Sequence, residues 1–269
     1  SSTSRGLGDV YKRQVSKYAK GTLSYAIDLA SHFKCNVYVI DAFPAHSSLT
    51  ILSNVNARLE IKNVQRIKKM VASITTKKDQ VKIVSSERDL VGTIRKLDQE
   101  LGLDLIVTGP LNNEINEAVF LGKIAGSMIK RTQVPVIIAP LDKTFTPSKK
   151  ILLAFRTGEV KTSSTLNALM YFQDSFLASL KLLLVKVPGF ENRNHQLNDD
   201  LMQRSDQMLF SENATVYQGV LEHFQANQPD MLIVFKRERG FFEKLWETDI
   251  VFKKDFYCTI PLLILKNKD

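Results

Sequence analysis

The sequence contains very little cysteine, and its few cysteines and histidines show no pattern typical of a disulfide framework or a metal site. Its 269 residues include 2 cysteines, Cys35 and Cys258, which lie far apart in the chain. Cys35 follows His32 by three residues but no second pair of ligands accompanies it, and Cys258 has no such neighbour. We therefore predict no disulfide framework and no metal site. This composition favours a reducing compartment, and we expect the protein to be cytoplasmic.

The chain also lacks any apolar run of the roughly 18 residues that a membrane span requires. Its composition is that of a soluble globular protein, with 44% hydrophobic and 24% charged residues. The net charge is +9, but the lysines are spread along the chain and no aromatic and basic residues alternate as in single-strand binders. We expect neither a membrane nor nucleic acid as a partner.

Motifs that carry catalysis are missing as well. The sequence has no Gly-x-Ser-x-Gly turn, no Gly-x-x-x-x-Gly-Lys-Ser/Thr phosphate loop and no glycine-rich kinase loop. Its 4 histidines stand apart from one another, which favours surface or helix-face positions. We therefore predict a binding protein rather than an enzyme.

A stretch of strand, loop, helix and strand is the most regular feature that the sequence does contain. An apolar run at 103–109 ends in a glycine, which is typical of a buried parallel strand. Residues 121–131 have apolar side chains at helical spacing, with two cations in the last turn. A second apolar run follows at 134–140.

The same stretch returns further along the chain. Asp104 in the first copy and Asp230 in the second, 126 residues apart, are each followed 31 residues later by a proline. The second copy again contains a helical segment, at 250–254, and a closing apolar run at 260–265. A fixed offset without gaps over a whole unit predicts two copies of one domain.

Between these stretches strands and helices alternate, which predicts a parallel sheet covered on both faces. The remaining predicted strands are 36–40, 81–84, 149–155, 180–185 and 215–217. The predicted helices are 16–33, one or two within 44–78, 89–101, 165–176, one through Leu201, Met202 and Met208, and 220–225.

In the order and spacing of these residues the chain resembles the universal stress protein family, as a tandem member. The resemblance covers roughly residues 15 to 269. It implies an α/β fold of two Rossmann-like (HUP-type) domains, each a mainly parallel five-stranded sheet with helices on both faces. Domain 1 is expected at 15–141 and domain 2, a degenerate copy, at 149–269, with a linker at 141–148.

The two domains are expected to pack as a pseudo-dimer, with 134–139 and 260–265 facing each other. We expect each domain to keep its own sheet.

Residues 1–14 do not fit the strand and helix pattern of the residues that follow them. Only the stretch Asp9 to Tyr11 has any apolar character where a first strand is expected. We interpret this segment as a non-native leader and expect it outside the first sheet.

Family members that bind ATP carry Gly-x-x-Gly and, nine residues later, Gly-Ser or Gly-Thr. Here Gly109 and Gly122 keep two of the glycines, while Asn112 and Lys123 replace the second glycine and the hydroxyl residue. Backbone amides at a helix start hold phosphates in such a site. The resemblance thus implies a possible ATP or other adenine-nucleotide site at Ile40, Asp41, Thr108, Gly109, Asn112, Gly122, Lys123 and Ile124. The alternative is that both glycines serve turn geometry alone.

The second copy has lost this pattern. At the 126-residue offset Phe235, Glu238, Thr248 and Asp249 replace the four motif residues, and the carboxylates would repel a triphosphate. We predict that this copy binds no nucleotide. Residues 236–246 are rich in cations and large aromatic side chains. The aromatic residues form either the apolar side of a helix or an association surface.

The resemblance implies a binding and regulatory module of the stress response, with at most one weak adenine-nucleotide site and an unknown protein partner. The alternatives are an interaction module without a nucleotide, or a nucleotide hydrolase of the same superfamily.

Overall fold

A computed structural model describes residues 5–42, 53–75, 80–86, 89–110, 123–140, 143–189, 197–236 and 260–266. The chain divides into two compact units, Ser1–Gly102 with Asp142–Phe145, and Leu103–Leu141 with Thr146–Asp269. None of the helices in the described ranges combines the length and the apolar character needed to cross a membrane.

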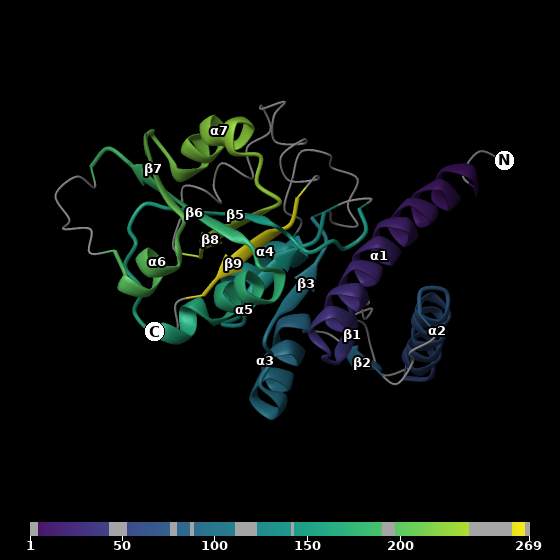
Figure 1. The fold of residues 1–269 in the computed structure, drawn as a ribbon. Helices are drawn as coiled ribbons and strands as arrows, with labels where there is room; N and C mark the ends of the chain where they lie inside the picture. Colours follow the sequence, from purple (N-terminus) through teal and green to yellow (C-terminus); the bar gives the residue numbers. More distant parts are fainter. Residues whose placement is uncertain are drawn as a thin grey trace. The chain divides into compact units, whose positions relative to one another are not determined.

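The first unit contains three helices and a small parallel sheet (Figure 1). Its elements are α1 (Arg5–Phe33), β1 (Val37–Ala42), α2 (Ser53–Ala72), β2 (Val81–Ser86) and α3 (Leu90–Leu101). β1 and β2 pair in parallel, with Val37 opposite Val81. The strands at 36–40 and 81–84 and the helix at 89–101 are thereby confirmed.

The core of this unit lies between α1, α2 and one face of its sheet. Leu23 and Ile27 of α1 meet Ile67 and Val71 of α2, and all four are buried. Alternate residues of the strands pack against them, namely Val37, Val39, Val81 and Ile83. This arrangement follows from the helical spacing of the apolar residues and from the period of two in the strands.

Residues 5–14 belong to α1, lie outside both sheets and supply no strand. This agrees with the expectation that these residues lie outside the first sheet.

The second unit contains the remaining elements (Figure 1). They are β3 (Ile106–Thr108), α4 (Lys123–Arg131), β4 (Val136–Ile138), β5 (Lys150–Phe155), a 3-10 turn (Ser163–Leu166), α5 (Asn167–Phe176), β6 (Ser179–Lys186), α6 (Asp199–Arg204), β7 (Gln207–Glu212), α7 (Val216–Asn227), β8 (Met231–Phe235) and β9 (Leu262–Leu265).

Five of its strands form a parallel sheet in the order β9-β8-β5-β6-β7, with β5 in the centre. Figure 1 shows α7 on one face and α5 and α6 on the other, as right-handed crossovers require. All residues of β8 and β9 are buried, as are five of the six in β5. This is the Rossmann-like α/β arrangement that the sequence predicted, and its switch point lies between β5 and β8.

β4 and β9 lie side by side and pair antiparallel, with Ile137 opposite Leu263. The prediction that these two strands face each other is confirmed. The expectation of separate sheets was wrong, because this pairing joins β3 and β4 to the five strands in one seven-stranded sheet. Two apolar edge strands satisfy their backbone donors and acceptors by pairing with each other.

The caps of α3 and α7 match at a spacing of 126 residues. The side chains of Asp89 and Thr215 accept a hydrogen bond from the first turn of the respective helix. Gly102 and Gln228 end the helices in the left-handed region and donate to the carbonyls of Asp98 and Phe224, both at 2.8 Å.

One predicted strand was wrong. Thr215 is the N-cap of α7, and Val216 and Tyr217 are the first residues of this helix. The strand lies earlier in the chain, as β7. Met208, which we assigned to a helix, belongs to this strand. The β-branched residues at 215–216 suggested a strand, but the threonine hydroxyl serves the helix start. The 126-residue offset from Val81 would have indicated Gln207 as the first residue of the strand.

The helix within 250–254 and most of the 190–198 loop lie outside the described residues.

Candidate functional site

Thr108 and Gly109 lie at the carboxyl end of β3, the edge at which ligands of parallel sheets bind. The carbonyl of Thr108 accepts a hydrogen bond of 2.8 Å from the amide of Ala139, just after β4. The Thr108 hydroxyl donates to the Gly109 carbonyl at 3.4 Å. Gly109 is half-buried and Pro110 is buried, so this turn is held against the end of the neighbouring strand.

Lys123 and Ile124 begin α4. In a strand–helix–strand unit the helix runs back along the sheet, so its first residues lie at the edge where the first strand ends. Its unsatisfied amides and its dipole favour an anion there. Ile124 is 38% exposed, whereas Ala125 and Met128 are buried, so the helix packs on the sheet through one face and leaves its start accessible.

Of the other predicted site residues, two lie in the first unit and two lie outside the described residues. Ile40 and Asp41 lie on β1 of the first unit, paired with Val84 and Ser85 of β2, and Ile40 is half-buried. Asn112 and Gly122 lie outside the described residues. The structure thus describes the strand end and the helix start of the predicted phosphate site.

At the 126-residue offset, the position that corresponds to Gly109 is occupied by Phe235, the last residue of β8. Its ring packs edge-on against Phe155 at the end of β5, with centroids 6.4 Å apart, and both side chains are buried. Large apolar rings therefore fill the strand ends at this switch point. Glu238, Thr248 and Asp249 lie outside the described residues, as does most of the 236–246 segment.

Two cations follow these phenylalanines. Arg156 comes directly after β5 and Lys236 directly after β8, and both are half-buried. The parallel register pairs Ala154 with Val234, so it carries Arg156 opposite Lys236 two residues later. Two cations therefore follow the central strands at the carboxyl edge of this sheet.

Sequence reasoning missed Lys266, which follows β9 and is only 2% exposed. Its Nζ donates to the carbonyls of Met128 and Ile129 at 3.1 and 2.5 Å and to that of Thr132 at 3.2 Å. These carbonyls lie at the end of α4, where the helix dipole is negative. Burial, with a contribution from Lys236, lowers the pKa of Lys266 to about 7. No local signal identified this residue, because it begins a polar tail in the sequence.

A second cluster that sequence reasoning missed joins the end of β7 to α7. The hydroxyl of Ser211 donates to Glu222 at 2.8 Å, and the amide of Asn213 donates to both residues. Hydrogen bonds from Ser211 and then Asn213 lower the pKa of Glu222. The cluster fixes the turn between the strand and the helix.

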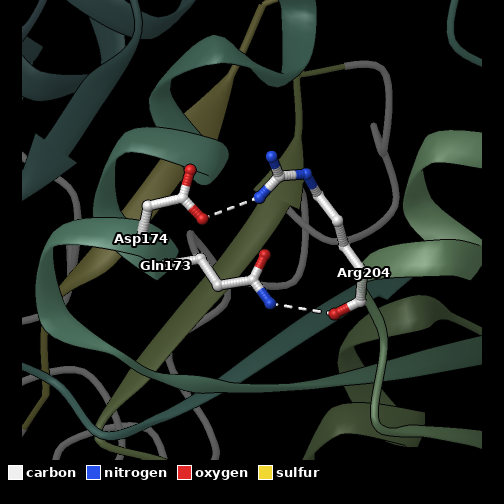
Figure 2. A network of polar contacts seen from close by, with 3 residues as sticks. All are labelled: Gln173, Asp174 and Arg204. Carbon is white, nitrogen blue, oxygen red and sulfur yellow. Dashed lines mark hydrogen bonds and ion pairs between the residues drawn. The ribbon is translucent and has the colours of Figure 1, made fainter.

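On the face of the sheet opposite α7, an ion pair and a hydrogen bond connect the ends of α5 and α6 (Figure 2). Arg204 forms an ion pair of 2.8 Å with Asp174, and the side chain of Gln173 donates to the Arg204 carbonyl at 2.9 Å. Both partners of the ion pair are accessible to solvent, so this link positions α6 more than it stabilises the fold. Across the described part of the chain, no three His, Cys, Asp or Glu side chains lie together as metal ligands would.

Comparison with solved structures shows a similar fold in a universal stress protein from Archaeoglobus fulgidus DSM 4304. The TM-score is 0.67 at 11% identity, over 94% of this chain and 95% of that chain. A functionally unknown protein from Pseudomonas aeruginosa PAO1 matches with a TM-score of 0.49 at 14% identity, over 91% of this chain and 87% of the other. The search of curated proteins found no match.

The family model described as "Universal stress protein family" matches residues 15–140. This range begins inside α1, includes both strands of the first unit, and ends just after β4. It therefore contains the predicted strand end and helix start. By sequence, residues 15–140 of this chain match the universal stress protein family, and the fold of the chain is similar to that of a solved member of this family.

Proposed function

We propose that the chain is a binding and regulatory module of the stress response, cytoplasmic and without catalytic activity, in which residues 149–269 are a second, degenerate copy of the domain. The matched caps of α3 and α7 support two copies. So does the backbone, because the amides of Ile106 and Leu232, 126 residues apart, donate to the prolines that precede β4 and β9. The antiparallel joint of these two strands makes the copies an internal pseudo-dimer.

The first copy carries a single adenine-nucleotide site, and the observation that supports it best is the position of α4. A helix that begins at the carboxyl edge of β3 presents its free amides to a phosphate that follows the turn at Gly109. The base would lie toward Ile40 and Asp41. Lys123 replaces the hydroxyl residue of family members that bind ATP, so the site loses a hydrogen-bond donor but gains a positive charge. The lost donor weakens phosphate binding and the charge strengthens it, each by about 1 to 2 kcal/mol.

This balance predicts weak binding, in the micromolar to millimolar range. The second copy lacks the site, because a buried phenylalanine closes the strand end at the equivalent position and the carboxylates of Glu238 and Asp249 repel phosphate.

Calorimetric titration with ATP tests this function. We expect Gly122→Val to abolish binding, because the added side chain occupies the space that the phosphate needs beside the backbone. Asp249→Ala, the matched change in the second copy, should leave the affinity within a factor of about two. Absence of heat with the unaltered protein at millimolar ATP would exclude the nucleotide site.

An interaction module without nucleotide is the second candidate, and exposed apolar side chains favour it. Leu177 after α5 is 84% exposed and Phe210 on the edge strand β7 is 60% exposed. Ser211 points to α7, so its neighbour Phe210 points to the opposite face, which carries α5 and α6 (Figure 1). Such apolar side chains suit association with an as yet unknown protein partner.

A further inference from the structure

The cations of this chain are spread along its length, but their excess over carboxylates is concentrated in one part. Residues 15–102 contain 14 lysines and arginines and 8 aspartates and glutamates, whereas residues 103–269 contain 20 and 19. Nearly all of the excess after residue 14 therefore belongs to the shorter stretch. Charge of one sign that is concentrated in this way attracts partners of the opposite sign.

α2 carries much of this excess. Its 20 residues include 5 cations and a single carboxylate, Glu60. No acidic residue occurs from 61 to 75, and within that range four cations are exposed. We call these four residues the cationic face of α2: Lys62, Arg66, Lys68 and Lys69.

The packing of α2 turns this face outward. Ile67 and Val71 are buried against α1 and the strands of the first unit. Lys62, Arg66 and Lys69 are spaced by four and three residues, so they form one line along the helix, about 10 Å long. Ile61 and Lys68 lie beside this line, and Ile61 is 57% exposed. The outer surface of α2 thus combines four cations with an exposed apolar side chain.

The fold itself does not account for these cations. Only Lys69 lies in the last turn, where the helix dipole stabilises a positive charge. Lys62 and Arg66 are like charges four residues apart, which destabilises a helix. The ion pairs between described residues lie on α3 and in the second unit, and none of them includes Lys62, Lys68 or Lys69. A face that costs the helix stability in this way suits binding.

We propose that the cationic face of α2 binds an acidic segment of a partner protein. The segment that fits is a helix with carboxylates at i, i+4 and i+7, which match the line of cations, and with an apolar residue that covers Ile61. Four cations are fewer than the roughly 6 to 10 phosphate contacts of DNA-binding proteins. One exposed isoleucine is also too little apolar surface to enter a membrane. Charge and apolar contact together therefore favour a protein.

This surface lies on α2, apart from the strand end of β3 and the start of α4, where the phosphate of the proposed nucleotide site would bind. The proposal names a class of protein partner and does not depend on nucleotide binding.

Fluorescence anisotropy tests the proposal with the full chain and a labelled, alanine-rich helical peptide. The peptide carries glutamates at i, i+4 and i+7 and one leucine beside them, and glutamines replace the glutamates in the control peptide. We expect the acidic peptide to bind at least about tenfold more tightly than the control. This preference should disappear between about 0.01 and about 0.15 M ionic strength, because the Debye length falls from about 30 to about 8 Å.

Charge reversal on the protein locates the site. Lys62→Glu should weaken binding of the acidic peptide about fivefold, because an attraction becomes a repulsion. Lys20→Glu, at an exposed position of α1, changes the net charge equally and should leave the affinity within a factor of about two. Equal losses in the two variants would overturn the proposal, because the binding would then reflect net charge alone.

Thermal unfolding distinguishes lost binding from lost structure. Lys62→Glu places a glutamate four residues before Arg66, the favourable order on a helix, so this variant should be at least as stable as the unaltered protein. A destabilised Lys62→Glu would show that Lys62 serves the fold, which would contradict a binding role.

Two further probes set the class of partner. A short DNA duplex and vesicles that contain phosphatidylserine are titrated under the same conditions. If either bound more tightly than the peptide and lost this affinity in Lys62→Glu alone, the face would belong to that class and the proposal would be wrong. Absence of peptide binding at low ionic strength would also overturn it. Gly122→Val should leave peptide binding unchanged, so failure of the nucleotide site and failure of this surface are observed separately.

Discussion

At the scale of single residues, Lys266 connects two elements that lie far apart in the sequence. It follows β9, the last described strand, and it donates to three carbonyls at the end of α4. Burial lowers its pKa to about 7, with Lys236 acting in the same direction. The carbonyls favour the ammonium, but a neutral amine retains two donors and can still serve two of them.

This residue predicts a specific pH dependence of stability. The pKa is lower in the folded protein than the ordinary 10.5, so between about 7 and about 10.5 the unfolded chain binds more protons. The contribution of Lys266 to the free energy of unfolding should therefore rise with pH through this window and stay constant below it. Urea unfolding of the unaltered protein and of Lys266→Met, at a series of pH values, measures the difference.

At about pH 9 we expect Lys266→Met to lower the free energy of unfolding by about 1 to 3 kcal/mol, because the carbonyls lose their donors. Below the pKa of about 7 the difference between the two proteins should be smaller. A difference that does not change with pH would contradict the lowered pKa.

At the scale of elements, four of the described helices end in a residue of left-handed backbone. α1 and α5 end in left-handed lysine and leucine, and α3 and α7 end in left-handed glycine and glutamine. Only Gly102 adopts this backbone without steric cost. Leu177 is in addition 84% exposed, so its side chain gains little from packing that could offset the cost.

We therefore predict that Leu177→Gly stabilises the protein by about 0.5 to 1 kcal/mol, because relief of the left-handed strain exceeds the added entropy of the unfolded chain. The matched change Gly102→Ala, at φ 65°, should destabilise by about 1 kcal/mol. Thermal unfolding of both variants measures the two shifts. Destabilisation by Leu177→Gly would mean that its exposed side chain makes a contact worth more than the strain.

At the scale of the whole molecule, the antiparallel pairing of β4 with β9 joins β3 and β4 to the five parallel strands in one sheet. Ile137 and Leu263 stand opposite each other in it, and both are fully buried. The alternation along the sequence predicted two buried strands, but only the assembled sheet brings them together. The joint also places Lys266 beside the end of α4.

A double-mutant cycle measures the energetic coupling between β4 and β9. Ile137→Ala and Leu263→Ala should each cost about 2 to 5 kcal/mol in unfolding free energy, with a coupling of about 0.5 to 3 kcal/mol between them. As a control, Ile137→Ala should add without coupling to Leu180→Ala on β6, which four strand spacings, about 19 Å, separate from β4. Strict additivity in the first pair would argue against the joint.

Sequence patterns determined most helices and strands, because the signals for these elements are local. The caps at Asp89 and Gly102, the apolar periodicity of α3 and the runs of β4, β5 and β8 are all readable within a few residues. The strand end and helix start of the candidate site were predictable for the same reason. β7 was missed because a threonine that looked like a strand residue caps a helix.

Only the tertiary structure decided which edges meet. The pairing of β4 with β9 and the burial of Lys266 against α4 both depend on residues more than a hundred positions apart. Periodicity shows that a residue faces a core, but not which core. Backbone groups at a strand edge have no sequence signature, so their partners become known only when the whole sheet is assembled.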